Sequence, residues 1–153
     1  MDLYLLRHAN ADTKAETDAA RPLSPKGVAQ SEKVARFCEA HQILPTIILT
    51  SPLVRAKQTA EIVAAHLQVK LETVAWLASG MQPENALRSL RPHEESERVM
   101  IVGHEPDFSE LAAHLLGDGT QLHLRKGSLT HFVVAELTAG VARLEFSLPP
   151  SLM

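Results

Sequence analysis

Short apolar runs alternate with longer segments of helical periodicity along the 153-residue chain. Short apolar runs bounded by turn residues indicate buried strands, whereas apolar residues three or four positions apart indicate helices. Strands are therefore predicted at about 2–7, 46–50, 70–74, 98–103, 130–136 and 141–147. Helices are predicted at about 25–41, 53–67, 83–91 and 107–117. This alternation of strand and helix is typical of an α/β protein.

The predicted fold class is α/β, a three-layer sandwich with a central, mostly parallel mixed sheet and helices on both faces. The last two strands flank a short turn at Thr138, Ala139 and Gly140, so we expect them to form an antiparallel hairpin at one edge of the sheet. Neither an internal repeat nor a low-complexity linker divides the chain. Its length is most simply explained by a single domain over residues 1–153.

Composition and charge exclude some classes of function. The formal net charge is -3 and no basic run occurs, which argues against binding along a nucleic-acid backbone. No stretch approaches 18 consecutive apolar residues, and the N-terminus lacks a signal-peptide pattern. We therefore expect no nucleic-acid partner, no membrane association and a cytoplasmic location. The single cysteine, Cys38, lies among apolar helix positions and is expected to be a packed thiol.

Two residues that suit phosphate chemistry follow the first predicted strand. Arg7 and His8 end the apolar run, and residues at the carboxyl end of such a strand open into the ligand crevice of an α/β sheet. Arginine offers a planar fork of donors to phosphate oxygens, and a neutral histidine is a nucleophile that can form a covalent intermediate. Alone, an Arg-His pair is weak evidence, because most such pairs are incidental.

Two other strands end in residues of the same kind. The strand at 46–50 is followed by Ser51-Pro52-Leu53-Val54-Arg55, which places Arg55 in the first turn of a helix, where free N–H groups and the helix dipole favour an anion. The strand at 98–103 ends in Gly103-His104. Arg21, in the loop before the first helix, is available as another phosphate contact. The three strand ends therefore predict one phosphoryl site.

The order and spacing of these segments closely resemble the histidine phosphatase superfamily, the phosphoglycerate mutase-like group, and within it the small SixA-like phosphohistidine phosphatases. Arg7-His8-Ala9 resembles the Arg-His-Gly motif that carries the nucleophile, with alanine where glycine is commoner. The segment from Ser51 to Thr59 resembles the second-arginine motif, and Gly103-His104 resembles the second histidine. The resemblance runs from the first strand to at least Pro106. It implies a phosphoglycerate mutase-like fold.

The resemblance also implies the chemistry: a metal-independent phosphatase without a cofactor. Neutral His8 would attack the phosphoryl group in line, and water would hydrolyse the phosphohistidine intermediate. Arg7, Arg55 and His104 would bind the equatorial oxygens, with Arg21 assisting. We expect the second ring nitrogen of His8 to donate to a backbone carbonyl or a similar acceptor, and His104 to be protonated beside the phosphate. The remaining histidines show no metal-ligand spacing, so no metal site is expected.

Two residues are candidates for the acid that protonates the leaving group. Glu105 follows His104, as an acid does in the histidine acid phosphatase branch, although it could instead cap the next helix. Glu84 could equally be a first-turn residue favoured by the helix dipole. A phosphohistidine substrate needs such an acid less, because its imidazole can leave protonated on the distal nitrogen. The lack of an obvious acid favours a P–N substrate over an alkyl ester.

Three functions remain open from the sequence. The leading one is a phosphohistidine phosphatase that acts on a phosphorylated protein, such as a phosphotransfer domain of a bacterial-type relay in signal transduction. The second is a phosphatase of small phosphate esters, including sugar phosphates. The third is a non-catalytic module that binds phosphate or a phosphoprotein, which fits less well because Arg7, His8, Arg55 and His104 are all present.

Overall fold

A computed structural model describes residues 1–96 and 98–153. Two of its helices begin at a proline, Pro25 and Pro83. The Ser24 side chain accepts a hydrogen bond from the Gly27 N–H and so caps the first helix, which begins at Pro25. The helices are α1 (Pro25–Ala40), α2 (Val54–Leu67), α3 (Pro83–Leu90) and α4 (Asp107–Leu116). In the part of the chain that the structure describes, none of the helices is long and apolar enough to cross a membrane.

The strands form one six-stranded mixed sheet in the order β3-β2-β4-β1-β5-β6. They are β1 (Asp2–Arg7), β2 (Ile47–Thr50), β3 (Lys70–Thr73), β4 (Arg98–Gly103), β5 (Leu129–Val134) and β6 (Ala142–Leu148). The first four strands are parallel where they pair, and β5 and β6 form an antiparallel hairpin next to β1. This confirms the predicted α/β class, the mostly parallel sheet and the terminal hairpin.

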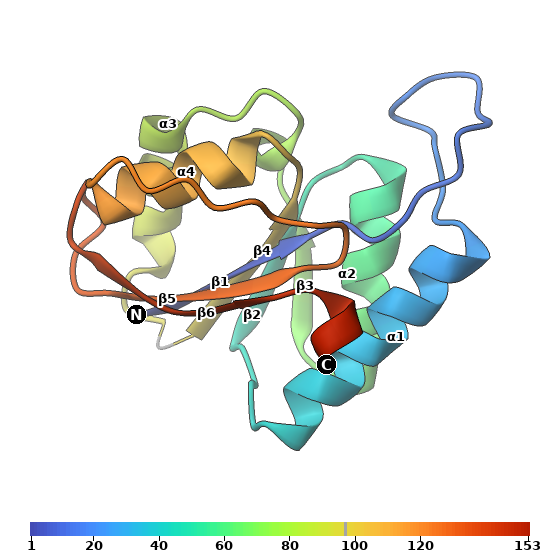
Figure 1. Ribbon diagram of the computed structural model, residues 1–153, viewed down its shortest axis with the longest axis horizontal. Coiled ribbons are helices and arrows are strands. Elements are labelled where there is room, and N and C mark those ends of the chain that lie inside the picture. Colours follow the sequence, from blue (N-terminus) through green and yellow to red (C-terminus); the bar gives the residue numbers. More distant parts are fainter. Residues whose placement is uncertain (97) are drawn as a thin grey trace.

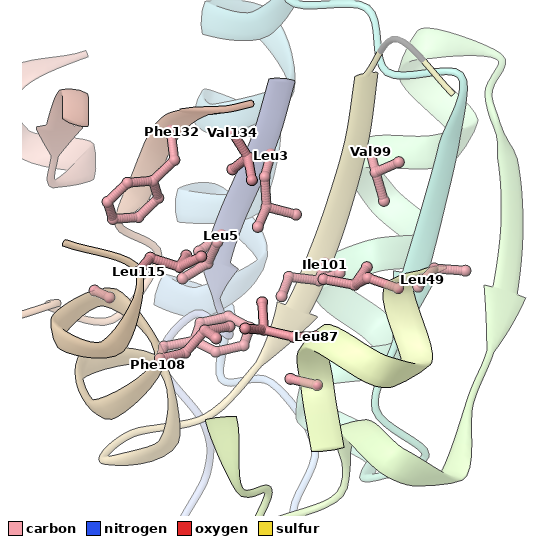
Figure 2. Close-up of a cluster of buried hydrophobic side chains, with 14 of the residues drawn as sticks. Leu3, Leu5, Leu49, Leu87, Val99, Ile101, Phe108, Leu115, Phe132 and Val134 are labelled. Carbon is pink, nitrogen blue, oxygen red and sulfur yellow. The ribbon is translucent and has the colours of Figure 1, made fainter. Parts of the chain in front are cut away.

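Helices cover both faces of the sheet, as predicted (Figure 1). Side chains of a strand alternate between the faces, so Leu3 and Leu5 of β1 pack on one side and Tyr4 and Leu6 on the other. The first face is covered by α3 and α4, and Figure 2 shows its core around Phe108. The second face is covered by α1 and α2. Two apolar cores therefore hold the sheet between two helical layers.

The element boundaries differ from the prediction mainly near the C-terminal hairpin and in three short 3-10 helices that the sequence pattern did not indicate. β5 ends at Val134, two residues earlier than predicted. The 3-10 helices are η1 (Ala75–Leu77), η2 (Arg91–His93) and η3 (Pro150–Leu152). A segment of this length has too few residues for a 3.6-residue periodicity to appear. The last of them lies against α1 with Pro150 buried, while Ser151 and Leu152 are exposed.

Candidate active site

The parallel register brings three strand ends to one edge of the sheet. Arg7 pairs with Gly103 in the β1–β4 register, and Thr50 pairs with Val102 in the β2–β4 register. The ladder continues one residue further, since the His8 N–H donates to the Gly103 carbonyl (3.0 Å) and the Ser51 N–H to the Val102 carbonyl (3.0 Å). The residues that follow β1, β2 and β4 therefore meet, as expected for carboxyl ends of parallel strands.

His8 lies at the centre of this edge. Its side chain is almost fully buried, and Nδ1 lies 2.8 Å from the Ala9 carbonyl oxygen, which can only accept. The proton therefore sits on Nδ1, and the acceptor that the sequence left unnamed is this neighbouring carbonyl. The pKa of His8 is lowered to about 3, chiefly by burial, with His104, Arg55 and Arg7 acting in the same direction and the hydrogen bond to Ala9 opposing them. His8 is thus neutral at physiological pH with an unprotonated Nε2.

Arg55 contacts the free nitrogen of His8. It is the second residue of α2, is 6% exposed, and its Nε donates to His8 Nε2 at 3.3 Å. The rest of its guanidinium bonds to Asp18, from Nη1 to the backbone carbonyl (2.9 Å) and from Nη2 to the carboxylate Oδ2 (3.2 Å). Asp18 therefore orients the fork of Arg55 with one edge toward His8.

Arg21 joins the same network through Asp18. Its Nη1 donates to Asp18 Oδ1 (3.0 Å), while its Nε donates to the Asp12 carbonyl (2.9 Å). The hydrogen bond from Arg21 and the charge of Arg55 lower the pKa of the exposed Asp18 carboxyl. Asp18 therefore bridges Arg21 and Arg55. The loop folds back through the Ala11–Leu23 bridge, a tertiary pairing that sequence distance does not reveal.

Arg7 is half-buried beside His8. Its Nη1 donates to the Leu124 carbonyl at 2.8 Å, and its Nε is buried without a hydrogen-bond partner among the described residues. Burial lowers the pKa of Arg7, Glu105 acts in the opposite direction, and Arg55 lowers it again. A buried donor without a partner is costly unless a ligand oxygen meets it, so this atom fits an oxyanion.

His104 faces His8, with ring centroids 5.3 Å apart. Burial, Arg55 and Arg7 lower its pKa to about 4, although Asp18 opposes the shift, so the groups of the protein alone keep His104 neutral. The expected protonated state therefore needs the charge of a bound dianion. The Ser51 hydroxyl accepts from the Leu53 N–H (3.2 Å) and lies 2.7 Å from His104 Nε2, to which it can donate its proton.

The proton of a neutral His104 then belongs on Nδ1. That atom is buried and has no partner within the described part of the chain, as is true of Arg7 Nε. Two unpaired buried donors thus lie on predicted phosphate-binding residues, one at the end of β1 next to His8 in the chain and one after the neighbouring strand β4. A tetrahedral oxyanion is a ligand of the right chemistry for them. Among residues 1–96 and 98–153 no group of three or more His, Cys, Asp or Glu side chains forms a cluster suited to a metal ion.

The two candidate acids are engaged elsewhere. The Glu105 carboxylate accepts from the Ser109 N–H (2.9 Å) and from the Ser109 hydroxyl, so in this conformation it caps the first turn of α4, the alternative role considered from sequence. Glu84 is exposed, and its carboxylate lies 3.9 Å from Nδ1 of His114 on α4. Neither carboxylate forms a hydrogen bond with His8, Arg55 or His104 in the described structure.

Sequence reasoning did not single out Thr59. This buried residue of α2 donates its hydroxyl proton to the Arg55 carbonyl (2.8 Å) and accepts from the Ala9 N–H (3.1 Å). The hydroxyl therefore connects the peptide that follows His8 to the helix that carries Arg55. The available signal was a threonine four residues after Arg55, on the same face of the helix.

The fold and this edge define an α/β protein with an oxyanion site of two facing histidines and buried arginines, the class to which histidine phosphatases belong. Residues 3–78 match the sequence model of the histidine phosphatase superfamily (branch 1). An uncharacterized protein of Picosynechococcus sp. is 33% identical over 153 residues, with 95% of this chain and 89% of the relative covered. Phosphohistidine phosphatase SixA of Escherichia coli is 27% identical over 75% of this chain and 74% of that protein.

Solved structures show the same fold. The protein histidine phosphatase SixA complexed with tungstate superposes with a TM-score of 0.92 at 23% identity, over 99% of each chain. The alpha-ribazole phosphatase of Shigella flexneri superposes with a TM-score of 0.78 at 17% identity, over 95% of each chain. The chain therefore belongs to the histidine phosphatase superfamily and is SixA-like, which confirms the resemblance inferred from its motifs.

Proposed function

We propose that this protein is a phosphohistidine phosphatase that removes the phosphoryl group from a histidine of another protein. The superfamily supports phosphatase activity, and the SixA relatives have phosphohistidine phosphatase in their names. The observation that carries the finer proposal is that His8 is neutral and oriented while neither candidate acid forms a hydrogen bond with a site histidine or Arg55 in the described structure. We further propose that residues 1–153 act as one domain, in the cytoplasm.

His8 is the proposed nucleophile. With Nδ1 held on the Ala9 carbonyl, the lone pair of Nε2 is the nucleophile, and it becomes available when the Arg55 Nε–H that it accepts turns to a phosphoryl oxygen. The P–Nε2 bond forms as the bond from phosphorus to the substrate imidazole breaks, and that imidazole leaves as the neutral base if its distal nitrogen already carries a proton. Water then attacks the phosphohistidine, releasing inorganic phosphate and returning His8 to its starting state.

The buried donors around His8 are the proposed oxyanion binders. Arg7 Nε, Arg55 Nε and the His104 Nδ1–H can each meet a phosphoryl oxygen with little rearrangement. Donors already in place in a water-poor site stabilise transition-state charge more strongly than mobile ones. A bound dianion also raises the pKa of His104, so the donor gains a positive charge when the substrate binds. Arg21 is proposed to assist through Asp18.

The leaving group distinguishes the candidate substrates. The alcohol part of an alkyl phosphate ester leaves as an alkoxide unless an acid protonates its oxygen. General acid catalysis of this kind typically raises the rate 10²–10⁴-fold. Glu105 is the nearest candidate in the sequence, yet its two oxygens bond to Ser109. An imidazole leaving group does not require this help. The arrangement therefore favours a P–N bond, while a small phosphate ester remains the second candidate.

The test compares phosphate release from a phosphohistidine peptide and from p-nitrophenyl phosphate, in the presence of EDTA, by wild type and His8→Ala. We expect turnover of the peptide by the wild type and none by the variant, which should still bind tungstate. Activity confined to the ester would refute the proposed substrate. Tungstate binding without turnover of either substrate by the wild type would instead indicate a binding module.

A second variant separates the two roles of Glu105. Glutamine at this position can still accept from the Ser109 N–H, so Glu105→Gln keeps the cap and removes only the acid. If Glu105 is not the acid, this variant hydrolyses both substrates at nearly the wild-type rate. A loss of about 10²-fold or more on an alkyl phosphate, with little loss on phosphohistidine, would assign the acid role to Glu105.

A further inference from the structure

A groove begins beside the phosphoryl site, on the side of Arg7 and Asn10. It has a volume of about 500 Å³, and its walls come from β1, from α1, from the loop before β5 and from η3. The last two segments meet closely, since a Cβ on Gly127 would lie 2.7 Å from Pro150 Cγ. In Figure 1 the 3-10 helix at the C-terminus lies next to α1. Its residues Pro150 and Ser151 line the groove.

The groove is strongly basic although the chain as a whole is acidic. Arg7, Lys26, Arg125 and Lys126 line it together with His123, and none of the described residues that line it is Asp or Glu. The net charge of the whole chain is -3. None of these four cations forms an ion pair within the described residues, and Lys26, Arg125 and Lys126 are exposed. Tertiary structure has thus concentrated unpaired positive charge next to the phosphoryl site.

The shape of the groove indicates an extended occupant. A second hollow of about 330 Å³ shares His123, Arg125, Pro149 and Ser151 with the first and continues along the C-terminal segment to Ser147. The cations of the walls come from β1, from α1 and from the loop before β5, and apart from Arg7 they are exposed side chains rather than buried donors that converge on one point. Such an arrangement matches charges spread along a segment better than one compact anion.

We propose that this basic groove docks an acidic segment of the phosphoprotein substrate, adjacent to the phosphohistidine. This inference rests on the proposed function and names the substrate class more closely: a protein whose phosphorylated histidine has Asp and Glu side chains nearby. Among the described residues, those that line the groove include no Phe, Tyr or Trp to stack on a nucleotide base, which favours an acidic protein segment over a nucleotide. Surface charges of this kind act mainly on the rate of encounter, and salt weakens them.

The test uses two phosphohistidine peptides of equal length, one with Asp and Glu flanking the histidine and one with Asn and Gln. The groove variant is Lys26→Glu/Arg125→Glu/Lys126→Glu. The control variant is Arg36→Glu/Arg88→Glu/Arg91→Glu, which changes the net charge equally at exposed arginines outside the groove. Turnover of p-nitrophenyl phosphate and thermal unfolding report whether each variant retains its phosphoryl site and fold.

For the wild type we expect kcat/KM on the acidic peptide to exceed that on the neutral peptide by roughly 10- to 100-fold at low salt, with the ratio falling as salt is added. The groove variant should lose this preference while it still hydrolyses p-nitrophenyl phosphate, and the control variant should keep most of it. Equal kcat/KM for the two peptides in the wild type would overturn the docking proposal and leave the phosphohistidine function intact.

Binding separates the docking proposal from the proposed function. The affinity of both peptides is measured on His8→Ala, with and without the three groove substitutions. If the wild type hydrolyses neither peptide but the acidic one binds at least tenfold more tightly in a groove-dependent way, the docking holds and the phosphohistidine function fails. If the groove substitutions weaken binding of inorganic tripolyphosphate and not of the acidic peptide, the groove is a site for a small anion and the proposal is wrong.

Discussion

The hydroxyl of Thr59 holds the nucleophile segment against α2, and its removal is predicted to impair both stability and catalysis. One oxygen accepts the Ala9 N–H and donates to the Arg55 carbonyl. Valine has nearly the same shape as threonine but can do neither. Thr59→Val therefore leaves the Ala9 N–H buried without a partner at a position that is 0% exposed, with little change in packing volume.

The loss of stability in Thr59→Val comes from the unpaired Ala9 N–H. Leaving a buried N–H unpaired costs about 1–3 kcal/mol, so the free energy of unfolding should fall by that amount. The catalytic effect arises because the carbonyl of the same residue holds His8 Nδ1 at 2.8 Å. If the Ala9 peptide moves to find a new partner, the imidazole moves with it. A displacement of about 1 Å can reduce the rate roughly 10²-fold, so kcat/KM is expected to fall between about 10- and 100-fold.

The assay measures kcat/KM on p-nitrophenyl phosphate and urea unfolding for wild type, Thr59→Val and Thr59→Ser. Serine keeps the hydroxyl and loses only a methyl group, so it should restore most of the activity. A residue with only a structural role would change the unfolding midpoint but not the activity of the folded protein. Wild-type kcat/KM in Thr59→Val under conditions where it is fully folded would refute this reasoning.

Three further predictions concern the site and its supports. Arg55→Lys replaces the forked guanidinium by one ammonium group that cannot contact both His8 and Asp18. The value of kcat/KM should therefore fall roughly 10²–10³-fold with an unchanged urea unfolding midpoint. A loss of kcat/KM below fivefold would argue against the proposed role of Arg55 in binding the oxyanion. Burial lowers the pKa of His8 to about 3 and of His104 to about 4 from the usual 6.5, so these histidines take up protons on unfolding between those values. The free energy of unfolding present above pH 6.5 should therefore decline as the pH falls toward 4, by up to about 1.4 kcal/mol per pH unit for each histidine. Urea unfolding measured from pH 7 to 4 should show a shallower decline for His8→Gln/His104→Gln than for the wild type. Equal declines in the two proteins would contradict the lowered pKa values of these histidines. Gly27→Ala should destabilise the protein by about 1–3 kcal/mol, since the new Cβ would lie 1.9 Å from the Asn10 carbonyl oxygen, and an unchanged urea midpoint would show that α1 moves aside freely.

Periodicity and strand-end residues were sufficient to predict the layers and the meeting of the candidate site residues. Apolar runs and helical spacing depend on which side chains must be buried, so they mark β1, β2, β4 and the four helices to within a residue or two. Parallel strands align their carboxyl ends, so the sequence predicts that Arg7-His8, Ser51 and Gly103-His104 lie at one edge of the sheet, as they do. The resemblance to histidine phosphatases follows from the same residues.

Hydrogen-bond partners within the site were not predictable in this way. Asp18 reaches Arg55, 37 positions away in the sequence, because the loop between β1 and α1 folds back on itself. Glu105 follows His104 in sequence, but its carboxylate turns to Ser109 in the next helix. Which side chains form these hydrogen bonds depends on side-chain rotamers and on the paths of loops. The spacing of apolar residues in the sequence carries no information on either.

Charge and protonation depended on the tertiary structure most of all. The sequence identifies His104 as a phosphate-binding histidine, but only its burial and the arginines around it make it neutral, because desolvation penalises the charged form. Lys26 and the Arg125-Lys126 pair are about a hundred positions apart, so the sequence shows no basic run, and the packing of η3 and the loop before β5 against α1 brings them to one groove. By itself the sequence determined the elements, the sheet edge and the family, since these follow from local burial patterns and strand direction. Which atoms are paired, which groups carry charge and where the positive surface lies were decided only when distant segments packed together.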